Sequence, residues 1–245
     1  MAGWGAGLRF SVGTLSVFPV RVDRVDREVA GQAMVLAPAV GLALGSVSCL
    51  PLLVPGSGLL EAALALGLLT VLTRALHLDG LADLADGLGS GKPAAQALDI
   101  MKKSDIGPFG VVTLVLTLLA QAAALAEAGP VALLAACVTG RLALTWACAV
   151  GVPSARPGGL GDMVAGTVRR RTALLVTLAV VAVAALAGVL LSRVVLPLAV
   201  LAGLGAALAL LHHARRRLGG ITGDVLGALV ETATAAVLVA CALLS

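Results

Sequence analysis

Long apolar runs recur along the whole chain, and no other feature of the sequence restricts its fold as strongly. A helix needs about 20 mostly apolar residues to cross the hydrocarbon core of a bilayer. Soluble domains are about 45–50% apolar, whereas 60% of these 245 residues are hydrophobic. We therefore predict an all-α, polytopic membrane protein in which residues 1–245 form a single domain. About seven spans are expected: 31–53, 59–76, 172–191, 194–212 and 225–243, and two more in the run 109–150, which is broken at 127–130.

The distribution of basic residues supports this count and predicts an orientation. With seven spans, four connections share one side of the membrane, and they hold fourteen of the 17 Lys and Arg residues. The connections on the opposite side hold only Arg193. Because basic connections tend to stay in the cytoplasm, we predict a multi-pass protein of the cell (inner or plasma) membrane, with its N-terminus and polar motifs on the cytoplasmic face. The four connections are 1–30, a cytoplasmic or interfacial segment, 77–108, the predicted catalytic segment, 152–171 and 213–224.

Three aspartates, Asp79, Asp83 and Asp86, follow the second apolar run at spacings of four and three. In a helix these spacings place the carboxylates on one face, about a turn apart. Like charges so close repel one another by roughly 0.2–0.5 kcal/mol per pair, and a hard divalent cation removes this repulsion. Oxygen-only ligands suit Mg²⁺ or Mn²⁺, and Mg²⁺ usually combines one or two carboxylates with the phosphates of a substrate. The spacing therefore predicts a membrane enzyme that uses Mg²⁺ to handle a diphosphate.

The same segment contains two glycines and a histidine. Gly80 and Gly87 each weaken a helix by about 1 kcal/mol relative to Ala, which we interpret as room for a ligand close to the backbone. His77 has three interpretations: a metal ligand, a proton carrier or an interfacial polar residue. A solvated loop is the alternative for the aspartates, but charged groups beside a membrane span are costly and usually functional.

Basic residues near this segment are candidates for a phosphate clamp. Lys102 or Lys103 is expected to contact phosphate, helped by backbone N–H groups around Gly107. The alternative is a positively charged anchor at the membrane surface. Arg74 and Arg156 are further candidates for the clamp.

Residues 219–231 bring polar groups into the last apolar run. Asp224 opens that span, where it either caps the helix or, with Thr222, orients a ribose or completes the metal shell. Glu231 lies about two turns further in, on the same helix face. An ionisable residue at that depth is expected to face a polar cavity or a partner, and Arg141 in the fourth span is the obvious partner.

These motifs resemble those of a known family, cobalamin synthase, also called adenosylcobinamide-GDP ribazoletransferase. Residues 77–87 are similar to its H-L-D-G-L-A-D-x-x-D-G signature, and residues 100–110 to its I-M-K-D-S-R-I-G segment. Residues 219–231 are similar to its G-G-x-T-G-D-x-x-G-A-x-x-E ending. Shorter likenesses are 159–161 and 15–19. Lys103 and Asp105 depart from the pattern, since many members have Asp and Arg there.

The resemblance implies the last assembly step of coenzyme B12. Adenosylcobinamide-GDP is joined to α-ribazole or its 5′-phosphate, GMP leaves, and the enzyme depends on Mg²⁺. Carried to this chain, Asp79, Asp83 and Asp86 hold one or two Mg²⁺ ions at the diphosphate, His77 is catalytic, and Asp83 is the favoured general base. The expected substrate-binding residues are Arg74, Lys102, Ser104, Gly107, Arg141, Arg156, Gly159, Thr222, Gly223, Asp224 and Glu231.

Two other functions stay open at this point. A CDP-alcohol phosphotransferase also places aspartates on membrane helices, but the Ala-Arg that follows Asp-Gly in its pattern is missing here. A cation-coupled transporter with Asp79, Glu231 and Arg141 along its path is the second alternative, although no repeat relates the two halves of the chain. Nucleic-acid binding is not expected, because the basic residues flank apolar runs and few residues are aromatic. The sequence is compatible with a homo-oligomer.

Overall fold

The structure is a computed structural model that describes residues 3–22, 25–56 and 58–244. In these ranges the chain forms eleven α-helices and one short 3-10 helix, and it contains no β-strand beyond two isolated bridges. The prediction of an all-α fold is confirmed. The helices are α1 (Trp4–Leu15), α2 (Arg27–Ser48), η1 (Leu50–Leu53), α3 (Leu59–Leu72), α4 (Leu76–Gly89), α5 (Ala94–Ile100), α6 (Pro108–Ala128), α7 (Pro130–Ala147), α8 (Gly159–Val164), α9 (Arg170–Leu190), α10 (Leu196–Leu218) and α11 (Gly223–Leu244).

Among the described residues, six helices are long and apolar enough to cross a membrane. α3 and α4 meet at a bend of 90° and add a seventh crossing if they are taken as one broken span. The predicted count of about seven agrees with this range. The predicted break at 127–130 falls between α6 and α7, where Gly129 has a φ of 75° and Pro130 begins the next helix, a position that needs no backbone N–H. The six helices are α2, α6, α7, α9, α10 and α11.

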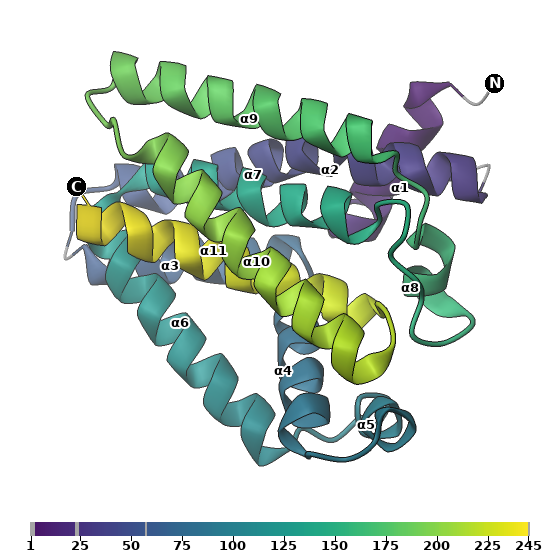
Figure 1. The fold of residues 1–245 in the computed structure, drawn as a ribbon. Coiled ribbons are helices and arrows are strands. Elements are labelled where there is room, and N and C mark those ends of the chain that lie inside the picture. Colours follow the sequence, from purple (N-terminus) through teal and green to yellow (C-terminus); the bar gives the residue numbers. More distant parts are fainter. Residues whose placement is uncertain (1–2, 23–24, 57, 245) are drawn as a thin grey trace.

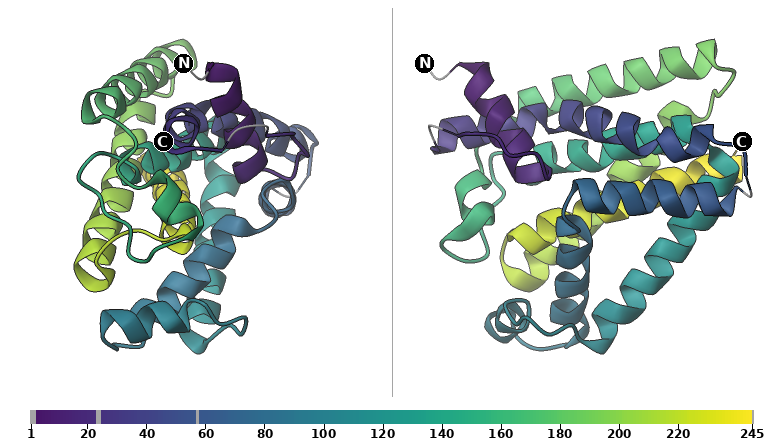
Figure 2. Two further views of the ribbon diagram at one scale, coloured as in Figure 1. Left: turned by 90° about the vertical axis from the view of Figure 1, so that its right-hand side faces the viewer. Right: turned by 180° about the vertical axis from the view of Figure 1, so that it is seen from behind.

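α11 lies inside the bundle and packs against α4, α6, α7 and α10. α2 lies along α7, and α9 runs along the outside of the bundle (Figure 1). Exposed large apolar side chains are frequent on α6 and α9, as expected for surfaces that contact lipid tails. α1 and the C-terminal end of α11 lie at opposite ends of the bundle (Figure 2).

The bend between α3 and α4 is made by two residues with left-handed backbone. Arg74 and Ala75 both have a φ of 55°. This conformation is uncommon for residues with a Cβ and costs about 1–2 kcal/mol each. As a result, α4 leaves the direction of α3 and runs away from the bundle, and α6 returns toward it (Figures 1 and 2). The elbow therefore presents the polar helix α4 beside the first turns of α11.

α4 and α11 approach each other through glycine. A Cβ on Gly80 would lie 2.7 Å from the carbonyl oxygen of Asp224, and a Cβ on Gly227 would lie 3.1 Å from the Cα of His77. We had expected Gly80 and Gly87 to leave room for a ligand, and this expectation is wrong. The backbone of Asp224 occupies the space at Gly80 and the side chain of Met101 that at Gly87, because the helices must pack this closely to bring α4 and α11 together.

Candidate active site

The three aspartates of α4 differ in exposure, although they are spaced along one face of the helix. Asp79 is exposed, Asp83 is half-buried and Asp86 is only 7% exposed. The charge of Asp83 is repelled by Asp79, then by Asp224 and Asp86. Arg156 supplies the opposing positive charge. The acidic centre of the site is therefore Asp83, and the start of α11 contributes to it.

Asp86 uses both carboxylate oxygens to hold the start of α6. Oδ2 accepts a hydrogen bond from the backbone N–H of Gly107 at 2.7 Å, and Oδ1 accepts one from Gly110 at 2.9 Å. A Cβ on either glycine would overlap the carboxylate. The N–H of Gly107, which we expected to face a phosphate, is thus taken by a buried carboxylate. We refer to Asp86, Gly107 and Gly110 as the carboxylate clamp.

The first turn of α11 presents Asp224 to the same region. The hydroxyl of Thr222 accepts from the backbone N–H of Val225 at 3.2 Å and lies 3.2 Å from Oδ2 of Asp224, to which it donates. Nη2 of Arg156 also lies 3.4 Å from that Oδ2 atom. Thr222 is therefore the cap of α11. Capping was one of the two roles that the sequence suggested for Asp224, whose carboxylate instead pairs with the guanidinium of Arg156.

Two polar cavities border these carboxylates. The acidic cavity, of about 220 Å³, lies between α4 and the turn before α6. The glycine cavity, of about 230 Å³, lies between the loop 154–162 and the start of α11. Asp83 lines the first and Asp224 lines the second, and the two carboxylates are close enough for the charge of Asp224 to act on Asp83. The acidic cavity also contains Asp86, Lys103, Asp105 and Phe109, and the glycine cavity contains Ser154, Arg156, Gly158, Gly159, Thr222 and Gly223.

The donors around Asp83 fit a cation that is shared with a substrate. In the part of the chain that the structure describes, no three His, Cys, Asp or Glu side chains converge as an all-protein metal site. Mg²⁺ rarely needs one, because phosphates and water usually complete its shell. Here carboxylate oxygens repel one another beside a cavity large enough for a phosphate. The three-aspartate ligand set stays a prediction, and Asp86 is its most engaged member.

A second polar group is buried between the helices. His77 is 3% exposed and Arg141 is 1% exposed. Nη2 of Arg141 lies 3.5 Å from Nδ1 of His77, and Oε2 of Glu231 accepts from Nε2 of Gln121 at 2.9 Å. Glu231 therefore bonds an amide that the sequence did not suggest. Arg141 lies beside the histidine and is close enough for its charge to act on Glu231.

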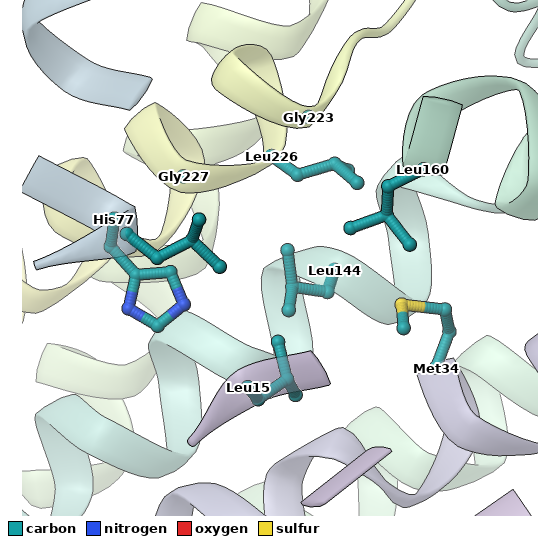
Figure 3. A pocket seen from close by; sticks show the side chains of 9 residues that line it. Leu15, Met34, His77, Leu144, Leu160, Gly223, Leu226 and Gly227 are labelled. Carbon is teal, nitrogen blue, oxygen red and sulfur yellow. The ribbon is translucent and has the colours of Figure 1, made fainter. Parts of the chain in front are cut away.

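His77 lines neither polar cavity. Its imidazole lies at the edge of a small cavity of about 20 Å³, on which the side chains of Leu15, Met34, Leu144, Leu160 and Leu226 converge (Figure 3). The cavity walls are almost entirely apolar. The catalytic role expected of His77 stays a prediction, and in this structure the ring is enclosed by packing.

Three of the predicted phosphate contacts lie apart from the carboxylates. Nη2 of Arg74 is directed to the carbonyl oxygen of Gly13 near α1, at 3.4 Å. Lys102 and Ser104 are exposed on the turn before α6 and line neither polar cavity. Lys103, next to both, does line the acidic cavity.

Two residues that shape the site were not singled out from the sequence. Arg27, the first residue of α2, donates to the carbonyl oxygens of Asp162 and Ala165 at 2.7 and 2.6 Å, and so anchors the loop beside the glycine cavity. No local pattern predicts this long-range contact. Phe109 lines the acidic cavity. The sequence did contain a feature that could have pointed to it, because aromatic residues are rare in this chain and Phe109 directly follows a Gly-Pro pair in a polar segment.

Comparisons with known proteins agree in their result. The family model described as cobalamin-5-phosphate synthase matches residues 7–242. A Frankia casuarinae protein named adenosylcobinamide-GDP ribazoletransferase is 45% identical, over 94% of this chain and 91% of its own length. Proteins of the same name from a Nocardioides species and from Stutzerimonas stutzeri are each 43% identical, over 95% and 94% of this chain and 96% and 94% of their own lengths. No solved structure matches the chain.

Proposed function

The chain belongs to the cobalamin-5-phosphate synthase family, and we propose that it carries out the last assembly step of coenzyme B12. The donor is adenosylcobinamide-GDP, the substrate named for its relatives. The acceptor is α-ribazole or its 5′-phosphate. A ribose hydroxyl oxygen of the acceptor forms a bond to the phosphorus on the corrinoid arm, the bond from that phosphorus to the GMP oxygen breaks, and GMP leaves.

One observation carries this proposal: Asp83 lines one polar cavity, Asp224 and Arg156 line another, and the charges of Asp224 and Arg156 act on Asp83. A transferase with two substrates needs two binding spaces that meet at the reacting atoms. A phosphoryl transfer needs positive charge where the phosphoryl oxygens and the leaving group gain negative charge. Arg156 supplies part of that positive charge. Its guanidinium contacts Asp224 through a single long distance of 3.4 Å, so it retains hydrogen-bonding groups for a phosphate.

The glycine cavity suits the diphosphate of the donor. Its wall includes Gly158 and Gly159, each with a φ of 78°, and Gly223. A Cβ built on any of the three would meet no atom within 4 Å, so these backbones border open space. The φ of Gly223 is not in the left-handed region, so neither packing nor conformation requires glycine there. We assign it to close approach of a phosphate to the first turn of α11.

Asp83 is the group best placed to take the proton of the acceptor hydroxyl. It lines the acidic cavity and lies nearest the other acidic charges of α4 and α11. Asp79 and Asp224 are the carboxylates we assign to a shared Mg²⁺ site, which leaves Asp83 to act as the base, while Asp86 stays in the carboxylate clamp. Bound there, the cation would neutralise the charge that builds on the phosphoryl oxygens and the departing GMP.

The site is proposed to face the cytoplasm. The three aspartates lie on α4, the second half of the bent pair α3 and α4. The turn 100–107 that follows it, the loop 154–162 and the start of α11 adjoin connecting segments that contain most of the Lys and Arg residues. The positive-inside rule places such connections in the cytoplasm, where nucleotide-activated substrates are found.

The test is GMP release by the purified, detergent-solubilised protein supplied with adenosylcobinamide-GDP and α-ribazole. We expect turnover with Mg²⁺ and none with excess EDTA. Asp83→Ala is expected to lower turnover at least 10²-fold, the usual scale for a general base, without loss of membrane insertion. Asp99→Ala is the matched control, because Asp99 is an exposed aspartate on α5 that lines neither polar cavity. Wild-type turnover by Asp83→Ala would refute the assignment.

A further inference from the structure

The turn that begins α6 is held in place from both sides. The carboxylate of Asp86 bonds the backbone of Gly107 and of Gly110, and Pro108 and Phe109 lie between these two glycines in the chain. Because both oxygens of a single buried carboxylate grip the turn, Phe109 has a defined place relative to α4. The clamp therefore shapes one wall of the acidic cavity.

The ring of Phe109 lies against the backbone of α4. A Cβ on Gly89 would lie 2.6 Å from Cγ and 2.9 Å from Cδ1 and Cδ2 of Phe109, so the missing side chain lets the ring approach the helix. Phe109 is nevertheless 51% exposed, and it lines the acidic cavity. Among the described residues, no other aromatic side chain lines either polar cavity. The ring is thus backed by protein on one side and open on another.

The two cavities differ in their excess of negative charge, which is larger in the acidic cavity. The acidic cavity holds Asp83, Asp86 and Asp105 against a single amine, that of Lys103. Such a cavity repels a diphosphate and suits a substrate with little or no negative charge. The glycine cavity holds Asp162 and Asp224 against the guanidinium of Arg156, so its excess of negative charge is smaller. Both carboxylates there have partners in the chain: Asp162 accepts from the backbone N–H of Gly158, and Asp224 pairs with Arg156. The open glycine backbone and the guanidinium suit a phosphate.

We propose that the acidic cavity is the acceptor site, where the flat aromatic base of the nucleoside stacks on Phe109 and its ribose hydroxyl reaches Asp83. This inference rests on the proposed function and assigns one of its two substrates to a particular cavity. Lys103 is the cation available to a 5′-phosphate when the acceptor carries one. Stacking between a base and an aromatic ring tolerates different bases, because every base has a π-face.

The experiment measures the KM for α-ribazole and for adenosylcobinamide-GDP separately, in full-length protein in detergent. Removing a stacking ring usually costs about 1–3 kcal/mol of base binding, or roughly 5- to 150-fold. Phe109→Ala is expected to raise the KM for α-ribazole in this range and to leave the KM for the donor unchanged. Phe109→Tyr keeps the ring and is expected to retain acceptor binding. The matched control is Phe18→Ala, because Phe18 is 48% exposed and lines neither polar cavity.

An unchanged KM for α-ribazole in Phe109→Ala overturns the inference. A variant whose KM rises for adenosylcobinamide-GDP and not for α-ribazole overturns it as well. Equilibrium dialysis with labelled α-ribazole gives the dissociation constant without turnover. If the wild-type protein releases no GMP, the proposed function is refuted. The dissociation constants of α-ribazole for wild type and for Phe109→Ala, each measured by dialysis, would still decide the acceptor site. Equal dissociation constants in the two proteins overturn it.

Discussion

Asp86→Asn tests whether this carboxylate is a structural clamp or a metal ligand. The substitution keeps the shape of the side chain but replaces one acceptor oxygen by an NH₂ group that faces a backbone N–H. A hydrogen bond to a charged group contributes about 1.5–3 kcal/mol, and an unpaired buried N–H costs about 1–3 kcal/mol. The relief of repulsion from Asp83 offsets only about 0.2–0.5 kcal/mol. We therefore expect a loss of about 3 kcal/mol in the free energy of unfolding.

For a chain of this length, 1 kcal/mol corresponds to about 2–4 °C in Tm, so Asp86→Asn is expected to lower Tm by roughly 6–12 °C in detergent without Mg²⁺. Gly110→Ala probes the clamp without changing any charge: its Cβ would lie 2.5 Å from Oδ2 of Asp86 and 3.0 Å from the carbonyl oxygen of Ala82. Such overpacking usually costs about 1–3 kcal/mol, so a drop in Tm is again expected.

The control for this prediction is Asp79→Asn, an exposed aspartate of the same helix. A substitution at an exposed position usually changes stability by less than about 0.5 kcal/mol, so its Tm should match wild type within about 2 °C. The clamp is refuted if Asp86→Asn unfolds at the wild-type temperature while the Mg²⁺ concentration for half-maximal GMP release rises. That result would return Asp86 to the set of metal ligands.

Two further substitutions separate glycines that serve packing from those that serve the substrate. Gly80→Ala forces a methyl group against the backbone of Asp224. We therefore expect Tm to fall by an amount equivalent to about 1–3 kcal/mol, and GMP release to fall with it. An unchanged Tm together with unchanged GMP release would contradict the packing at this crossing. The new methyl group of Gly223→Ala would have no atom within 4 Å, so Tm should stay within about 2 °C of wild type. The KM for adenosylcobinamide-GDP is expected to rise. An unchanged KM would show that no phosphate approaches this backbone.

Local patterns were sufficient for the membrane helices. The length of an apolar run and the Gly-Pro break at 129–130 depend only on neighbouring residues, and most predicted spans overlap a long apolar helix. The predicted second span, 59–76, is the exception, because α3 ends at Leu72 and is long enough to cross only together with α4. The helical spacing of the aspartates was also predictable, because three and four residues are close to one turn of α-helix. These expectations needed no knowledge of which helices pack together.

The contacts within the site were less predictable. Asp86 bonds residues 21 and 24 positions further along the chain, and Asp83 is repelled by Asp224 because α4 crosses α11 at Gly80. Arg141 was expected to pair with Glu231 and lies beside His77 instead. Each of these contacts depends on the elbow at Arg74 and Ala75, whose left-handed backbone carries no sequence signal, since neither residue is glycine.

Read alone, the chain thus specified its apolar runs, the clustering of its basic residues between them and the helical spacing of its aspartates, because these follow from composition and from periodicity within single helices. Only the tertiary structure decided which groups lie near each carboxylate. The charge of Asp224 acts on Asp83, and Asp86 accepts a hydrogen bond from the start of α6. Spacing places a side chain on its own helix, whereas the group opposite it depends on how closely two helices can approach, and here glycine and one strained elbow decide that distance.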